Sequence, residues 1–289
     1  MRFSLDIGWI PNYISYEKLF DRLKTAGISN ISYNFLCANN KTELLYADSY
    51  LKNAEEIRMH LDNAGITCLQ CYAPFSLKLC DERLNRFEPS YGELVRALEF
   101  ASVLGAKTLV CCAVQVPQNV SQTEKNYKIY RSLIPYCEKF GVRIAISSNF
   151  PKCINSSVLT TPWENAEDYF NFIRSFNSSY IAASVDIGDG LDNLVKADDF
   201  MAFFSKDMLA LVNIKDSAKY RDVHTAPYFE QAGLDGFVKA LTDIGYEGTL
   251  NLECPAFMEK YPSELLGDIL GLFADIGRYI CGLAEVDIL

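Results

Sequence analysis

Five times along the chain, an amphipathic helical pattern ends at a glycine, and an apolar segment begins one or two residues later. The glycines are Gly27, Gly65, Gly105, Gly141 and Gly245, and the first four are 38, 40 and 36 residues apart. Glycine ends helices readily because it adopts the left-handed conformation without steric cost. The spacing fits one helix, one strand and two loops. The repeat therefore predicts helices alternating with strands, which favours a parallel sheet.

Eight short segments have the near-continuous apolar composition of strands that are covered on both faces. They are residues 3–7, 28–33, 67–72, 108–112, 142–147, 181–186, 209–214 and 249–253, with a last helix over about 263–283. Eight such units predict an α/β protein with a (β/α)8 TIM barrel, forming a single domain over residues 1–289. The alternative is a doubly wound open sheet, which usually has a glycine-rich phosphate loop after its first strand. The segment Gly8-Trp9-Ile10-Pro11-Asn12 does not match that motif.

Charge and hydropathy narrow the range of partners. The 289 residues include 27 basic and 37 acidic side chains, a formal net charge of −10. That balance disfavours nucleic acid and anionic membranes as partners. No apolar run approaches the ~18 residues of a membrane span, and the first eight residues, MRFSLDIG, predict a strand rather than a signal peptide. We therefore expect a cytoplasmic protein whose thiols are reduced.

Cys68 and Cys71 form a C-x-x-C motif inside the third predicted strand. Residues three apart on a regular strand face opposite sides of the sheet. We therefore expect two buried thiols here rather than a redox or zinc site.

In TIM barrels the active site forms where the strands end and the βα loops begin. Polar residues at the predicted strand ends are Asn34, Tyr72, Ser147, Asp186, Asn213, Lys215 and Glu253. Asp186 and Glu253 each close an apolar strand, which makes them candidate catalytic acid/base groups or metal ligands. The alternative is a carboxylate that only accepts backbone N–H bonds in the next loop. Trp9 and Tyr72 are candidate substrate contacts, because aromatic faces suit the C–H faces of sugars.

The chain has only two histidines, His60 and His224. A site built on three histidines is therefore impossible within one chain. His60 lies in a predicted helix and has a structural interpretation, whereas His224 follows the seventh strand and is either a substrate contact or a surface residue. Lys215 is a candidate for substrate binding, including a Schiff base, or a solvated lysine at a strand end.

Taken together, these segments resemble the xylose isomerase-like barrels, often described as sugar phosphate isomerases/epimerases and related to endonuclease IV. The likeness extends over nearly the whole chain and is clearest at 72–75, 93–101, 107–110, 141–146, 185–188, 214–216 and 245–253. The resemblance implies a small sugar or polyol as substrate, free or phosphorylated. It also suggests a homo-oligomer.

The resemblance further implies one divalent ion, held by Glu, Asp, His and Glu from strands five to eight. Asp186 and Glu253 match two of these ligands, but Ser147 stands at the first glutamate and Asn213 at the histidine. It thus predicts Mg²⁺, Mn²⁺ or Zn²⁺ at a weakened site of Asp186, Glu253 and Asn213, or no metal. Ser147 cannot act as a base near pH 7, so an epimerisation would need a second group beside Glu253. Asp189 and His224 are the candidates.

Two functions therefore remain open. The first is a sugar or polyol isomerase/epimerase with a partly degenerate metal site. The second is a non-catalytic relative that binds a sugar-like ligand. DNA repair of the endonuclease IV type is disfavoured, because it needs several metals, many histidines and a basic groove.

Overall fold

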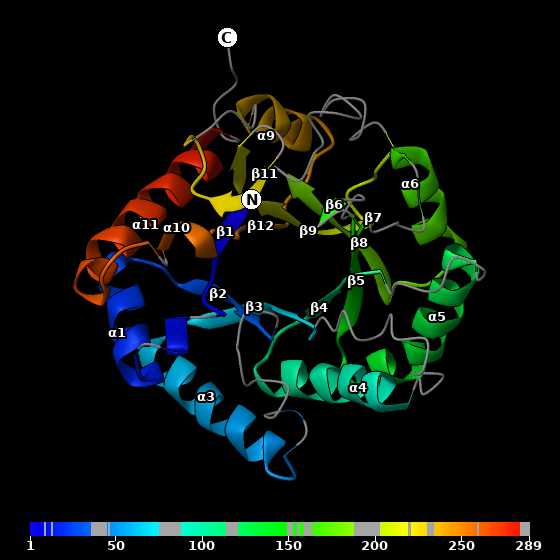
Figure 1. Ribbon diagram of the computed structural model, residues 1–289, viewed down its shortest axis with the longest axis horizontal. Coiled ribbons are helices and arrows are strands. Elements are labelled where there is room, and N and C mark those ends of the chain that lie inside the picture. Colours follow the sequence, from blue (N-terminus) through cyan, green and yellow to red (C-terminus); the bar gives the residue numbers. More distant parts are fainter. Residues whose placement is uncertain are drawn as a thin grey trace.

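A computed structural model of the chain describes residues 1–8, 10–12, 14–35, 45, 47–74, 88–113, 121–148, 153–154, 157–158, 163, 165–187, 203–218, 221–229, 234–258 and 260–283. Eight parallel strands close into a barrel. In chain order they are β1 (Arg2–Asp6), β2 (Asn30–Asn34), β3 (Thr67–Tyr72), β4 (Thr108–Cys111), β5 (Arg143–Ser147), β8 (Ile181–Ile187), β9 (Leu209–Ile214) and β12 (Thr249–Leu252). β12 pairs with β1, so the sheet has no open edge (Figure 1). The predicted TIM barrel is confirmed, and no strand boundary differs from its prediction by more than two residues.

Helices surround this barrel (Figure 1). They are α1 (Tyr16–Ala26), α3 (Tyr50–Ala64), α4 (Glu88–Val103), α5 (Gln122–Phe140), α6 (Ala166–Ser175), α9 (Leu234–Asp243) and α11 (Leu266–Leu283). Short helices are η1 (Ile10–Asn12), α10 (Pro255–Met258) and η3 (Ser263–Leu265). Within the described residues, two antiparallel hairpins form: β6 (Cys153–Ile154) with β7 (Ser157–Val158), and β10 (Asp216–Ala218) with β11 (Arg221–Thr225). Within the described ranges, no helix combines the length and apolar character needed to cross a bilayer.

The five repeat glycines determine how helices turn into strands. Their φ angles are 79°, 70°, 83°, 65° and 69°, all in the left-handed region that favours glycine. After each glycine, the next backbone N–H donates to the carbonyl five residues earlier, as Ile28 does to Leu23 at 2.9 Å and Val142 does to Cys137 at 3.1 Å. This hydrogen bond closes the last helical turn and starts the chain on an inward path. The repeat seen in the sequence is therefore a repeated helix end.

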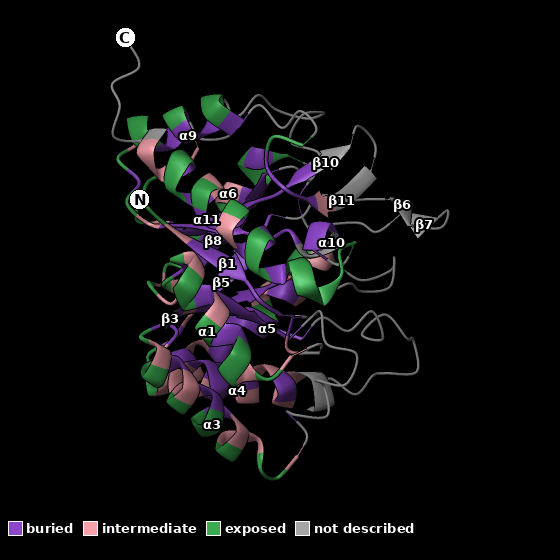
Figure 2. Ribbon diagram, turned by 90° about the vertical axis from the view of Figure 1, so that its left-hand side faces the viewer, coloured by how far each residue is buried: buried purple, intermediate pink, exposed green. Residues whose placement is uncertain are grey.

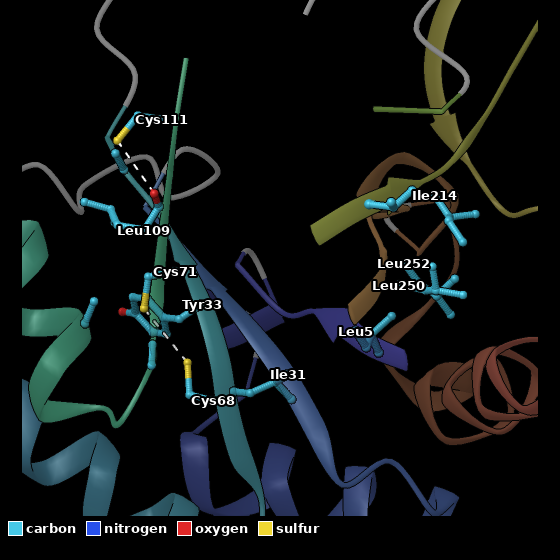
Figure 3. Close-up of a cluster of buried hydrophobic side chains, with 14 of the residues drawn as sticks. Leu5, Ile31, Tyr33, Cys68, Cys71, Leu109, Cys111, Ile214, Leu250 and Leu252 are labelled. Carbon is cyan, nitrogen blue, oxygen red and sulfur yellow. Dashed lines mark hydrogen bonds between the residues drawn. The ribbon is translucent and has the colours of Figure 1, made fainter. Parts of the chain in front are cut away.

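Side chains along each barrel strand alternate between two environments. Outward-facing residues such as Leu5, Ile31 and Leu250 are fully buried in the core cluster between strands and helices (Figure 3). The residues between them face the barrel interior, and many are polar. Buried examples are Ser4, Ser32, Gln70, Ser184 and Asn251. Because every barrel strand is covered on both faces, its sequence is mostly apolar. The sequence therefore does not clearly indicate that the barrel interior is polar.

The expectation that Cys68 and Cys71 face opposite sides is wrong. Their sulfur atoms are 3.9 Å apart, and both side chains are buried in the outward-facing core (Figure 3). The cause is a register shift between β2 and β3, where Ile31 pairs with Cys68 but Ser32 pairs with Gln70. One extra residue in β3 turns the two thiols onto one face. Burial raises the pKa of Cys71 well above its usual value, with further contributions from Cys68.

Candidate functional site

Inward-facing polar side chains gather at the carboxyl ends of the barrel strands. They are Asp6, Asn34, Tyr72, Ser147, Asp186, Asn213, Lys215 and Glu253, and none exposes more than 7% of its surface. The β10–β11 hairpin lies at this same end, on the opposite side of the barrel from the N-terminus (Figure 2). The alternation within each strand produces the arrangement, because successive inward-facing residues are two positions apart. The predicted strand-end residues are thus brought to one end of the barrel.

Asp186 accepts hydrogen bonds on both of its carboxylate oxygens. Nδ2 of Asn213 donates to Oδ1 at 2.6 Å, and the Ser147 hydroxyl donates to Oδ2. The Asp186 backbone N–H donates in turn to the Ser148 hydroxyl at 3.1 Å. The serine and asparagine at the positions where the resemblance implied a glutamate and a histidine therefore bind the aspartate directly.

Asn251, one strand further on, fixes the orientation of the Asn213 amide. Its Nδ2 donates to Oδ1 of Asn213 at 3.1 Å and to the Tyr72 hydroxyl at 2.9 Å. Its Oδ1 accepts from Ser4 at 2.9 Å and from Ser32 at 3.0 Å. Because Oδ1 of Asn213 accepts from Asn251, the amide nitrogen of Asn213 must point the other way, toward Asp186. Sequence reasoning missed Asn251; the signal was its position two residues before Glu253.

Tyr72, a predicted substrate contact, belongs to the same network. Its hydroxyl donates to Oδ1 of Asn213 and accepts from Asn251, and the residue is 3% exposed. Burial raises the pKa of Tyr72 well above its usual value, and the nearby charges of Glu253 and Asp186 raise it further. The hydroxyl therefore stays protonated at neutral pH and acts as a donor within the barrel.

Lys215, Glu253 and His224 meet on the side of β9 and β12. Nζ of Lys215 is 3.3 Å from Oε2 of Glu253 and 3.4 Å from Nε2 of His224. Nδ1 of His224 is 3.9 Å from Oε1 of Glu253. Lys215 is 2% exposed, whereas the His224 side chain is 29% exposed. The structure thus brings together three residues that the sequence had proposed separately.

Asp6 is a further buried carboxylate at this end of the barrel, and sequence reasoning missed it. Its Oδ1 accepts from the Gly8 backbone at 2.8 Å, and its Oδ2 accepts from Nδ2 of Asn34 at 2.7 Å. Gly8 must be small here, because a Cβ on it would lie 2.3 Å from Cβ of Asn34. The available signal was an acid at the end of an apolar first strand, the same feature that singled out Asp186.

The donor set around Asp186 does not fit a bound divalent ion. Both Asp186 oxygens accept hydrogen bonds, and Asn213 turns its nitrogen toward Asp186 while its oxygen accepts from Tyr72 and Asn251. Glu253 faces the ammonium of Lys215, whose charge repels a metal ion. Among the residues that the structure describes, no group of three or more His, Cys, Asp and Glu side chains could hold a metal.

Some predicted residues fall elsewhere. Trp9 and Asp189 lie outside the described residues. His60 is part of α3 and is partly exposed, on the helix that covers the barrel rather than at its mouth.

Comparisons with known proteins agree with this architecture. The family model described as xylose isomerase-like TIM barrel matches residues 15–267. A xylose isomerase domain protein from Alicyclobacillus acidocaldarius superposes with a TM-score of 0.74 at 15% identity, covering 99% of this chain and 100% of that one. D-psicose 3-epimerase from Clostridium cellulolyticum H10, solved with D-tagatose, gives 0.72 at 11% identity, covering 97% and 99%.

The IOLI protein, solved with a bound zinc atom, gives a TM-score of 0.74 at 16% identity and covers 100% of both chains. At these identities the structural matches establish the fold alone. A comparison with curated protein sequences finds no match. The family-model match extends over most of the barrel, and on that ground this chain belongs to the xylose isomerase-like TIM barrel family.

Proposed function

We propose that this protein is an isomerase or epimerase of a small sugar, or of a polyol that carries a keto group, in which Glu253 moves a proton on the carbon beside the carbonyl group. The observation that carries this proposal is the buried ion pair of Glu253 with Lys215, at the end of the barrel where catalytic groups collect. The Glu253 side chain is 10% exposed, so its contact with solvent is limited but not absent. The family, whose structural relatives include D-psicose 3-epimerase, supports the substrate class.

The chemistry follows from the carboxylate. Glu253 removes the proton from the carbon beside the carbonyl, the C–H electron pair becomes a C=C bond, and the carbonyl electron pair moves onto oxygen. Return of the proton to the neighbouring carbon, with transfer of the hydroxyl proton between the two oxygens, gives an isomer. Return to the same carbon from the other face gives an epimer. Nδ1 of His224 is only 3.9 Å from Oε1 of Glu253, so the two groups lie on the same side of a substrate, and the second face needs another group. Asp189, outside the described residues, stays the predicted candidate for that face.

No metal step enters this proposal, because the groups around Asp186 are engaged with Ser147 and Asn213. The predicted Mg²⁺, Mn²⁺ or Zn²⁺ is tested separately below. A cytoplasmic location, a homo-oligomer and the absence of nucleic acid partners also stay predictions. The free and phosphorylated forms of the sugar are both included in the experiment.

The test is solvent exchange of carbon-bound hydrogen. The protein is incubated in D₂O with a panel of ketoses, including D-fructose, D-tagatose and D-psicose, and with ketose phosphates, and products are followed by NMR. We expect deuterium at one carbon beside the carbonyl, and at least a ~100-fold lower rate in Glu253→Gln. Glu247→Gln, on an exposed residue, is the matched control and should keep the rate. Equal rates in both variants would overturn the role of Glu253.

A second candidate function is a non-catalytic protein that binds a sugar-like ligand. The observation in its favour is that Asp186 is held by two neutral donors, as a structural carboxylate would be. Calorimetric binding of a panel sugar, without exchange in wild type and unchanged in Glu253→Gln, would favour this alternative.

A further inference from the structure

The position of Lys215 follows from the hairpin that begins directly after it. β10 starts at Asp216 and pairs with β11 so that Asp216 lies opposite Thr225. Both of those residues are buried, at 0% and 1% exposure. The hairpin therefore lies at the carboxyl end of the barrel (Figure 2). It returns His224 to Lys215, nine residues earlier in the chain.

The backbone at His224 has an uncommon conformation. Its φ is 40°, and Tyr228, four residues on, has a φ of 67°. Left-handed backbone in a residue with a Cβ costs roughly 1 kcal/mol or more, so it persists only where surrounding contacts require it. Here it accompanies the approach of the imidazole to Lys215 and Glu253, with Nε2 3.4 Å from Nζ and Nδ1 3.9 Å from Oε1.

The contacts of Lys215 leave room for exchange. Its distances of 3.3 Å to Glu253 and 3.4 Å to His224 are longer than the ~2.9 Å optimum of an N–H hydrogen bond. An ammonium has three N–H donors, so an oxygen of a ligand can compete for one of them. As the ammonium partner of Glu253, Lys215 donates hydrogen bonds, whereas nucleophilic attack would require the neutral amine.

We propose that the Lys215 ammonium is a catalytic residue that supplies the positive charge for the carbonyl oxygen, in place of a divalent ion. Nε2 of His224 lies 3.4 Å from the nitrogen of that ammonium. The inference rests on the function proposed above. It follows from the poor fit of the site to a metal ion, because Asp186 and Asn213 are hydrogen-bonded to each other. Lys215, the one buried cation described at this end of the barrel, lies against Glu253, the candidate base.

The charges balance through the reaction. Before it, Glu253 carries −1 and Lys215 carries +1. When Glu253 takes the proton it becomes neutral, the C–H pair forms the C=C bond, and the carbonyl pair places −1 on the substrate oxygen. The ammonium then faces that oxygen instead of the carboxylate, and the net charge of the buried site is unchanged. In other enzymes, removing one preorganised hydrogen-bond donor from the position of developing charge costs ~10²–10³ in kcat.

The test uses protein dialysed against EDTA, with residual metal measured, and the ketose exchange assay in D₂O. The variants are Lys215→Met, Lys215→Gln and Lys215→Arg. Glutamine keeps a donor for Glu253 and so guards against a folding defect, while arginine keeps the charge. Lys206→Met, on an exposed lysine, is the matched control.

We expect the dialysed wild type to keep its exchange rate. The neutral variants should lose at least ~100-fold in kcat with KM changed only a few-fold. Arginine should recover part of the loss, and Lys206→Met should match wild type. Wild-type rates in both neutral variants would overturn the role of Lys215.

Two other outcomes separate this inference from the proposed function. If dialysis abolishes exchange and Mn²⁺ restores it, the function stands and the role of Lys215 in place of a metal is wrong. If wild type exchanges no ketose with or without added metal, the proposed function fails, and this inference fails with it.

Discussion

Nδ2 of Asn213 lies 2.6 Å from Oδ1 of Asp186, and the two residues are direct partners across the β8–β9 pair. Residues at the same register on neighbouring parallel strands cannot avoid contact, so the chemistry of one determines what the other can do. Because residue 213 is an asparagine, it donates a hydrogen bond to Asp186. A histidine at residue 213 would instead be a second metal ligand beside Asp186.

Metal affinity should therefore be recoverable by changing two side chains. In Ser147→Glu combined with Asn213→His, both neighbours of Asp186 become metal ligands. We expect Mn²⁺ at about 100 times its Kd to raise the Tm of the double variant by about 5 °C, following from ~2.7 kcal/mol of binding linkage. Wild type should shift by less than about 1 °C. Purified wild type with about one ion per chain, lost in Asp186→Ala, would contradict this prediction.

Asn251 should matter for stability more than any single surface polar group. Its amide takes part in hydrogen bonds with Ser4, Ser32, Gln70, Tyr72 and Asn213 inside the barrel. Asn251→Ala leaves several of these buried groups without a partner, and we expect a loss of about 3 kcal/mol in the free energy of unfolding. Asn171→Ala, on an exposed residue of α6, should stay within about 0.5 kcal/mol. Urea unfolding compares them, and equal losses would refute the network argument.

The sequence predicted the barrel well, because helix ends and apolar strands are local signals. The glycine at position 141 and the apolar residue after it fix one helix–strand junction almost by themselves. The site was harder to predict, because its hydrogen bonds join side chains on different strands. The sequence around Asn213 does not indicate that its amide nitrogen faces Asp186. That orientation is imposed by Asn251, 38 residues away.

The C-x-x-C motif shows a second limit of sequence reasoning. Its expected geometry failed because a register shift depends on how β3 pairs with β2, which periodicity within one strand cannot reveal. The polar interior was missed for a related reason. Asn251 and Glu253 are separated by one leucine. Hydropathy averaged over several residues therefore does not reveal that the two polar side chains share one face of the strand.

The buried cysteines should resist alkylation in the native protein. Burial raises the pKa of Cys71, Cys111 and Cys254 well above the usual value and that of Cys137 to about 12. Few thiolates are then present at pH 8, and access is also blocked. Among the seven cysteines whose burial the structure describes, we expect iodoacetamide to label the partly exposed Cys112 and Cys281 first. Peptide mass spectrometry before and after urea measures this, and rapid native labelling of Cys71 would contradict the described packing.

Two glycine-to-alanine variants should have effects of opposite sign. Gly141 ends α5 with a φ of 65°, whereas Gly271 lies inside α11, and a Cβ at either position meets nothing within 4 Å. The two positions are therefore matched in the space available for a Cβ, and they differ only in backbone conformation. Gly141→Ala should cost about 1–2 kcal/mol, because alanine is strained in the left-handed region. Gly271→Ala should gain about 0.5–1 kcal/mol, because alanine restricts the unfolded chain and favours the helix. Urea midpoints decide between the two cases, and a loss of stability in both variants, or in neither, would show that the helix-ending conformation is not what the repeat glycines supply.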